Sequence, residues 1–147
     1  MTIKMSTAAR TAVFSTGLKN ALNNHCLCVY SGAEPASADA ALGAAVRLLS
    51  ITTSGLGTPL DFETPANGVM LKKATDVWMG TNLATGTPSF YRLEPLDDTG
   101  AAAPELVRLQ GSVGPSGDLR LDVATLVIDE VQPVNYYDLQ MPASMLG

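Results

Sequence analysis

Charge is scarce in this sequence of 147 residues. Charged side chains make up 16% of it, and nine Lys and Arg against fourteen Asp and Glu give a net charge of −5 at pH 7. Surfaces of small domains usually carry about 25 to 35% charged residues. We therefore expect other subunits to cover part of the surface. The alternative is a solvent-exposed surface formed largely by the uncharged residues Ala, Ser, Thr and Gly. The few cations are dispersed, which disfavours nucleic acid as a partner because phosphate binding needs clustered Lys and Arg.

Long apolar runs are absent as well. The best candidate, residues 40–51, is interrupted by Gly43, Arg47 and Ser50 and does not reach the roughly 18 apolar residues that cross a bilayer. A 46% share of hydrophobic residues and a mean hydropathy of +0.17 exclude a disordered chain. The first residues lack the apolar core of a secretory signal, so we expect a protein made in a cytoplasm. Its length predicts one domain over residues 1–147.

Histidine and cysteine are too few for the commonest catalytic and metal sites. The only histidine, His25, precedes Cys26, and Cys28 is the only other cysteine. Neighbouring residues of a strand point to opposite faces, so a dyad of His25 and Cys26 is not expected. Structural zinc takes four ligands, normally from two separated pairs, and no second pair exists here. We predict no enzymatic activity, no metal and no cofactor, and we interpret both cysteines as reduced, structural thiols.

One further motif has the composition of a site without its spacing. Asp97-Asp98-Thr99-Gly100 is acidic and ends in glycine. It lacks the regular acidic spacing and the closing Glu of a calcium-binding EF-hand loop. We therefore expect an ordinary turn there, within an exposed loop over residues 96–104.

Helical periodicity marks one segment near the start. Ser6 or Thr7 can cap a helix that extends to Leu22, with apolar residues such as Ala9 and Leu18 on one stripe. Gly17 weakens the middle of this helix by up to about 1 kcal/mol relative to Ala. Residues 1–5 are expected to form a flexible N-terminal arm.

From His25 onward the hydrophobic period changes to two. Cys26, Cys28 and Tyr30 then share one face of a strand, and Leu27 and Val29 share the other. This pattern, repeated between turn residues, predicts a mainly β fold: an antiparallel β-sandwich or a jelly-roll-like barrel with one N-terminal α-helix. Besides residues 25–30, the expected strands are 44–53, 60–63, 69–72, 77–80, 89–94, 106–113, 119–127 and 134–141, with a loop over 33–43.

The late part of the chain carries a hairpin signal. Two extended runs, residues 106–113 and 118–123, flank the link Gly114-Pro115-Ser116-Gly117. A link of this length and composition is typical of a β-hairpin. In the second run apolar and charged residues alternate, so we expect one face in the core and one face in water or against a partner.

Aromatic residues are only 5% of the chain, and several stand in adjacent pairs. In a strand, such a pair places one ring on each face, so we expect one ring in the core and its neighbour at an interface. The interface candidates are Trp78, Tyr91, Tyr136 and Tyr137. The alternative is that these rings line a carbohydrate- or peptide-binding groove.

Three stretches together resemble a family of small virion structural proteins of tailed bacteriophages. Leu18-Lys-Asn-Ala-Leu22, followed by residues 27–41, resembles the opening of these proteins. Asp76-Val-Trp-Met-Gly-Thr81 with residues 86–92, and Arg108-Leu-Gln-Gly-Ser-Val-Gly114, are similar to their later segments. The resemblance covers about residues 17–123, and it implies a context in virion assembly without implying any functional residue.

That context favours two locations in the particle. A capsid decoration protein, which docks on the outer shell and stabilises it, is the first expectation. A neck, collar or tail component at the head-to-tail junction, including a fibre-associated binding module, is the alternative. The expected partners are copies of the chain itself and other virion proteins, such as the major capsid protein or neck and tail proteins. The expected location is the virion, after synthesis in the host cytoplasm, with no contact to nucleic acid or membrane.

Overall fold

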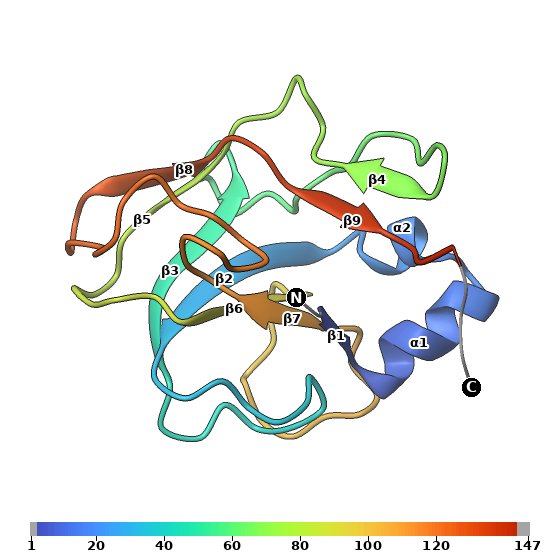
Figure 1. Cartoon of the computed structure of the whole chain (residues 1–147), viewed down its shortest axis with the longest axis horizontal. Helices are drawn as coiled ribbons and strands as arrows, with labels where there is room; N and C mark the ends of the chain where they lie inside the picture. Colours follow the sequence, from blue (N-terminus) through green and yellow to red (C-terminus); the bar gives the residue numbers. More distant parts are fainter. Residues whose placement is uncertain (1–2, 144–147) are drawn as a thin grey trace.

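Residues 3–143, the part of the chain that the computed structural model describes, form a mainly β structure (Figure 1). The helices of this part are short, and the strands make two antiparallel sheets. The elements are β1 (Lys4–Met5), α1 (Thr7–Phe14), α2 (Leu18–Ala21), β2 (His25–Ser31), β3 (Val46–Thr53), β4 (Val69–Leu71), β5 (Trp78–Thr81), β6 (Phe90–Pro95), β7 (Leu109–Ser112), β8 (Val131–Val134) and β9 (Asp138–Gln140).

The larger sheet has seven strands in the order β1-β7-β6-β2-β3-β5-β8, and the smaller sheet pairs β4 with β9. Figure 1 shows β4 and β9 lying over the larger sheet. Met70 of β4 and Leu139 of β9 belong to the same core cluster as Leu27 of β2 and Ile51 of β3. Two sheets that share a core in this way are consistent with a β-sandwich, so the predicted fold class is confirmed.

The central strand β2 is buried on both of its faces. Leu27 and Val29 lie in the large core cluster, under the smaller sheet. Cys26, Cys28 and Tyr30 lie in a second, smaller cluster on the opposite face. The period of two expected for this strand is therefore confirmed, and both halves of the alternation are buried.

The N-terminal helix starts where the sequence predicts and stops earlier. The Ser6 hydroxyl accepts a hydrogen bond from the Ala9 backbone N–H at 3.1 Å, which makes Ser6 the N-cap of α1. The helix ends at Phe14, and the chain turns through Gly17, whose φ is 85°, before α2 begins. The single helix to Leu22 was therefore wrong: the left-handed backbone at Gly17 divides it in two.

The structure contains neither the flexible N-terminal arm at residues 3–5 nor the late hairpin. Lys4 and Met5, expected in a flexible arm, form β1 and pair with Gln110 and Leu109 of β7. Residues 1 and 2 lie outside the described part of the chain. β6 pairs with one side of β7, and β1 takes the other side at Leu109 and Gln110. Residues 118–123 therefore reach β7 only where the Leu119 N–H donates to the Ser112 carbonyl at 3.0 Å, and the predicted hairpin does not form.

Residues 119–127 therefore form no strand but contribute isolated bridges at Leu119 and Leu126. The turn that replaces the hairpin is held by Asp118, whose Oδ2 accepts hydrogen bonds from the backbone N–H and the hydroxyl of Ser112 at 3.0 and 3.1 Å. Two other expected strands also differ from the structure. Residues 60–63 form only a bridge at Phe62, and the strand expected over 134–141 is divided between β8 and β9.

The two edges of the large sheet are unfavourable for pairing with a further strand. At one edge, β8 contains Pro133, which has no backbone N–H to donate. The Pro133 carbonyl already accepts a hydrogen bond from the side chain of Gln132 at 2.8 Å. At the other edge, β1 is two residues long, and Lys4 forms an ion pair with Glu34 at 2.8 Å. Proline, lysine and short length are features that protect sheet edges.

Gly80 of β5 allows a close approach between strands. A Cβ at this position would overlap the Ser50 carbonyl oxygen of β3 and lie 2.9 Å from Leu49 Cδ1. We expect Gly80→Ala to lower the free energy of unfolding by about 2 to 3 kcal/mol because β3 and β5 must separate. The matched control is Thr81→Ala, the exposed next residue, for which we expect a change within about 0.5 kcal/mol. Urea unfolding measures both, and equal stability of Gly80→Ala and the wild type would contradict the close approach.

Candidate functional site

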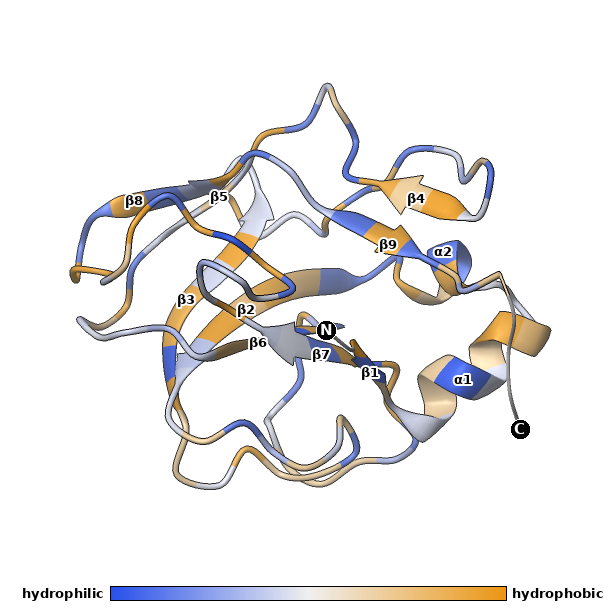
Figure 2. Ribbon diagram, viewed as in Figure 1, coloured by the Kyte–Doolittle hydropathy of each residue, from blue (hydrophilic) through white to orange (hydrophobic). Residues whose placement is uncertain are grey.

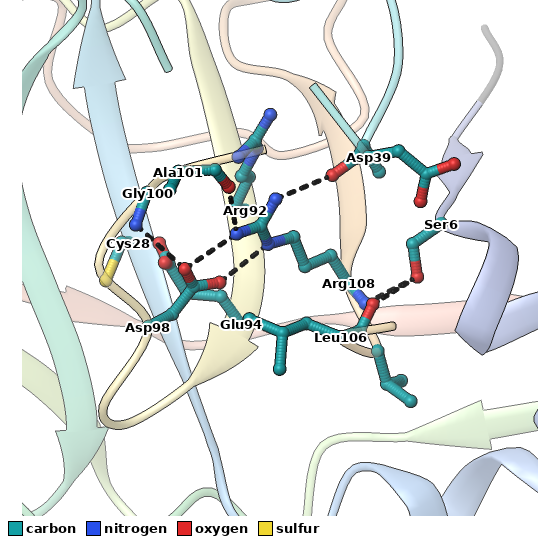
Figure 3. Close-up of polar contacts among 12 residues, drawn as sticks. Ser6, Cys28, Asp39, Arg92, Glu94, Asp98, Gly100, Ala101, Leu106 and Arg108 are labelled. Carbon is teal, nitrogen blue, oxygen red and sulfur yellow. Dashed lines mark hydrogen bonds and ion pairs between the residues drawn. The ribbon is translucent and has the colours of Figure 1, made fainter. Parts of the chain in front are cut away.

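A buried cluster of charged side chains lies on the face of the large sheet opposite to the main core (Figure 3). Arg92 and Glu94 project from β6 on the same face as Phe90, and Asp98 and Arg108 come from the connection between β6 and β7. Asp98 is 8% exposed and the other three charged residues are fully buried. Buried charges are rare unless paired, so their partners decide what this cluster does.

Arg108 is the most fully bonded member of the cluster. Its Nε and Nη2 donate to the two carboxylate oxygens of Asp98 at 2.6 and 2.8 Å. The same guanidinium donates to the backbone carbonyls of Ala38 at 3.1 Å and Ala101 at 2.7 Å. Burial alone would raise the pKa of Asp98, but the hydrogen bonds from Arg108 and from the Gly100 backbone N–H outweigh it and lower that pKa. The acidic motif at 97–100 is thus a turn, as predicted, whose carboxylate anchors an arginine.

Arg92 makes a second set of bonds to the same cover. Its Nε donates to Gln110 Oε1 at 2.8 Å, and its Nη2 donates to the Ala40 carbonyl at 2.7 Å. Gln110 in turn donates to the Pro35 carbonyl at 2.8 Å. Both arginines therefore fasten the long β2–β3 connection, residues 32–45, over the sheet.

Like Arg92, whose buried Nη1 has no hydrogen-bond partner, Glu94 is an incompletely compensated charge of the cluster. The Tyr30 hydroxyl donates to its Oε1, while its buried Oε2 has no hydrogen-bond partner and lies 3.7 Å from Arg47 Nη2. Burial, and then the nearby Cys28, raise the pKa of Glu94 to about 8. At neutral pH this carboxyl is therefore largely protonated.

The two cysteines lie beside Glu94 and are free, buried thiols, as the sequence predicts for structural cysteines. Their sulfur atoms are 3.6 Å apart. Their mutual hydrogen bond lowers the pKa of Cys26 and raises that of Cys28. His25 is also buried and its Nε2 donates to the Val107 carbonyl at 2.7 Å. Among residues 3–143 no group of three His, Cys, Asp or Glu side chains is arranged to hold a metal ion.

Three of the four interface candidates are core residues. Trp78, Tyr91 and Tyr137 are buried, and the hydroxyls of Tyr91 and Tyr137 lie 2.9 Å apart in a hydrogen bond. One buried and one exposed ring, the arrangement expected of an adjacent pair, is found for Tyr137 and Tyr136 but not for Phe90 and Tyr91. Trp78 and Tyr91 lie in the main core, which the smaller sheet covers. The partner ring Phe90 is buried too, because the fastened loops cover the opposite face. Tyr136, the fourth candidate, is 67% exposed.

Tyr136 borders an open groove of about 450 Å³. The groove lies between residues 117–122 and residues 133–138, and three of its lining residues are Asp118, Asp122 and Asp138. Arg120 is the only cation along it. Trp78 and Tyr91 are not part of this groove, so the aromatic residues do not gather around one concave site.

The sequence analysis missed a second surface, which we call the apolar tip and define by Leu83, Val127, Ile128 and Val131. All four side chains are exposed, by 55%, 42%, 49% and 60%. Backbone pairing brings them to one end of the large sheet, because Val131 pairs with Thr81 and Asn82 bonds to residues 129 and 130. Figure 2 shows this end, at the free end of β8, with apolar residues in its loops. The signal in the sequence is the apolar run 126–128 followed directly by Asp129 and Glu130, which lies at and beyond the end of the strand expected over 119–127.

Comparison of the chain with protein-family models, curated proteins and solved structures finds no match. In the described part of the chain, no helix has the length and apolar character to cross a membrane.

Removal of Arg108 tests the fastening role of the buried cluster. Arg108→Ala leaves the Asp98 carboxylate buried without its cation, which typically costs about 3 to 5 kcal/mol. We expect a loss of this size in the free energy of unfolding, measured by urea unfolding. The matched control is Arg120→Ala at an exposed position, for which the change should stay within about 0.5 kcal/mol. Equal effects of the two variants would argue against the fastening role.

Ionisation of Glu94 predicts a pH dependence of stability. The folded state holds a proton on Glu94 up to about pH 8, whereas the unfolded chain releases it near its ordinary pKa of about 4.3. This contribution is therefore fully present below the ordinary pKa and is lost as the pH rises through 8. Glu94→Gln should reduce the fall in stability between about pH 5 and about pH 9, measured by urea unfolding. Burial lowers the pKa of His25, which makes stability rise with pH. This contribution is the same in the wild type and in Glu94→Gln, so it cancels in the comparison. Identical pH profiles would refute the assignment.

Proposed function

We propose that this chain is a non-enzymatic structural protein of a tailed-bacteriophage virion, and that it acts as a decoration protein on the outside of the capsid shell. Two observations support this: residues 17–123 resemble such proteins, and the folded chain exposes an apolar surface. Its partners are copies of itself and other virion proteins, with the major capsid protein as the one it docks on.

The observation that carries the proposal is the apolar tip. A small protein that exposes neighbouring Leu, Ile and Val side chains supports docking better than a free existence in water, since clustered apolar surface marks interaction sites. The scarcity of surface charge adds to this, because four of the charged residues, Arg92, Glu94, Asp98 and Arg108, are buried in the fastening cluster. Arg92, Asp98 and Arg108 hold the loops, Glu94 accepts from Tyr30 within the sheet, and none of the four solvates the surface.

A neck or tail component, including a fibre-associated binding module, is the second candidate. The groove beside Tyr136 favours it, because an exposed aromatic ring with polar groups around a concave surface is typical of ligand recognition. The burial of Trp78 and Tyr91 in the core, where no ligand can reach them, favours decoration over a binding module.

Copy number in the particle separates these candidates. Mass spectrometry of purified virions of the phage that encodes the chain gives its copies per copy of the major capsid subunit. We expect a ratio near one, or one implying hundreds of copies, because a decoration protein follows the symmetry of the shell. About six to a few dozen copies, as in rings of cyclic symmetry, would assign the chain to the neck, tail or fibres. Absence from the particle would overturn the structural role.

A further inference from the structure

The turn that carries the apolar tip is held rigidly by a buried residue. Asn82, which is 3% exposed, donates from its backbone N–H to the Glu130 carbonyl at 2.8 Å and accepts from the Asp129 N–H at 3.0 Å. Its side-chain amide donates to the Val127 carbonyl at 2.9 Å. A further bond joins the Ile128 N–H to the Thr85 hydroxyl at 3.0 Å. These bonds fix Val127 and Ile128 in an exposed position.

Such fixation is favourable for binding. Apolar side chains on a mobile loop can turn inward, and ordering them upon association costs free energy. Here the backbone of the turn is ordered in the folded chain, because Asn82 and Thr85 hold it by hydrogen bonds before any partner arrives. The tip therefore combines exposed apolar side chains with a hydrogen-bonded backbone.

Acidic residues define the chemistry of the partner. Asp129 and Glu130 are exposed in the middle of the tip, and neither forms an ion pair with any residue of the described chain. The tip segment itself, residues 127–131, holds these two carboxylates and no Lys or Arg. The negative field of this end attracts a basic surface and repels an acidic one.

We propose that the apolar tip is the docking surface for a different protein, which presents an apolar patch bordered by Lys or Arg side chains. This inference rests on the proposed function, in which that protein belongs to the virion. A second copy of the chain does not fit a symmetric contact at the tip, because the two copies would bring Asp129 and Glu130 against the same carboxylates. Like charges opposed in an interface cost several kcal/mol.

The test is co-sedimentation of the purified chain with heads, and separately with tails, assembled without it. The first variant, Leu83→Ser with Ile128→Ser, removes exposed apolar groups without touching the core. We expect it to weaken binding by about tenfold or more. The second, Asp129→Asn with Glu130→Gln, should weaken binding and flatten its dependence on salt. Asn tolerates the φ of 71° at Asp129, so the turn is retained.

The matched control is Asp97→Asn with Glu105→Gln, which makes the same change in net charge on the exposed β6–β7 connection. Its binding should equal that of the wild type. Wild-type binding that both tip variants retain would overturn the docking surface and leave the proposed function intact. Failure of the wild type to bind either particle would overturn the proposed function and the inference with it. Sedimentation velocity of each pure chain completes the test: if the tip variants change the oligomeric state, the occupant is a second copy and the inference is wrong.

Discussion

The structure depends on covering both faces of one sheet. The strands β2 and β6 are buried on both faces. The smaller sheet and the main core cover only one of these two faces. The other cover consists of the two connections at residues 32–45 and 96–108, which have no regular structure and whose carbonyls need donors. Arg92 and Arg108 supply these donors from beneath. A buried ion pair adds little stability over well-packed apolar residues, but it fixes the geometry, and here it determines where the connections lie.

Much of the fold could be predicted because local patterns agreed with it. The alternation at residues 25–30, the Ser6 cap and the turn at 97–100 each follow from nearby residues, and the structure retains them. The failures arose from long-range competition. Nothing local shows that Lys4 and Met5 occupy the edge of β7 that the hairpin required. Gly17 was recognised as a weak point, but whether the chain turns there depends on the packing of Ala9 and Leu22 against the sheet.

The buried charges and the interface were harder to predict for a related reason. Arg92 and Glu94 alternate with apolar residues, which in a single strand is also the pattern of a solvated face. Only the presence of a second cover distinguishes the two environments, and that cover is irregular. The same holds for the aromatic residues: Trp78 and Tyr91 are buried under a second sheet that the sequence did not place, whereas Tyr136 is exposed. Ile128 and Val131 are exposed at the end of the large sheet because Asn82, which is distant in sequence from Val131, bonds to the turn that carries them.

The closed edges of the large sheet have a consequence for behaviour at high concentration. Addition of one β-strand to another is the route by which sheet proteins polymerise into fibrils, and it needs a free row of backbone donors and acceptors. Pro133 lacks a donor, the side chain of Gln132 occupies its carbonyl, and the opposite edge is two residues long. A chain built this way can accumulate to high local density while each copy keeps its own sheet. Contacts between copies or with partners then depend on side chains, which can bind and release without any change in the strands beneath.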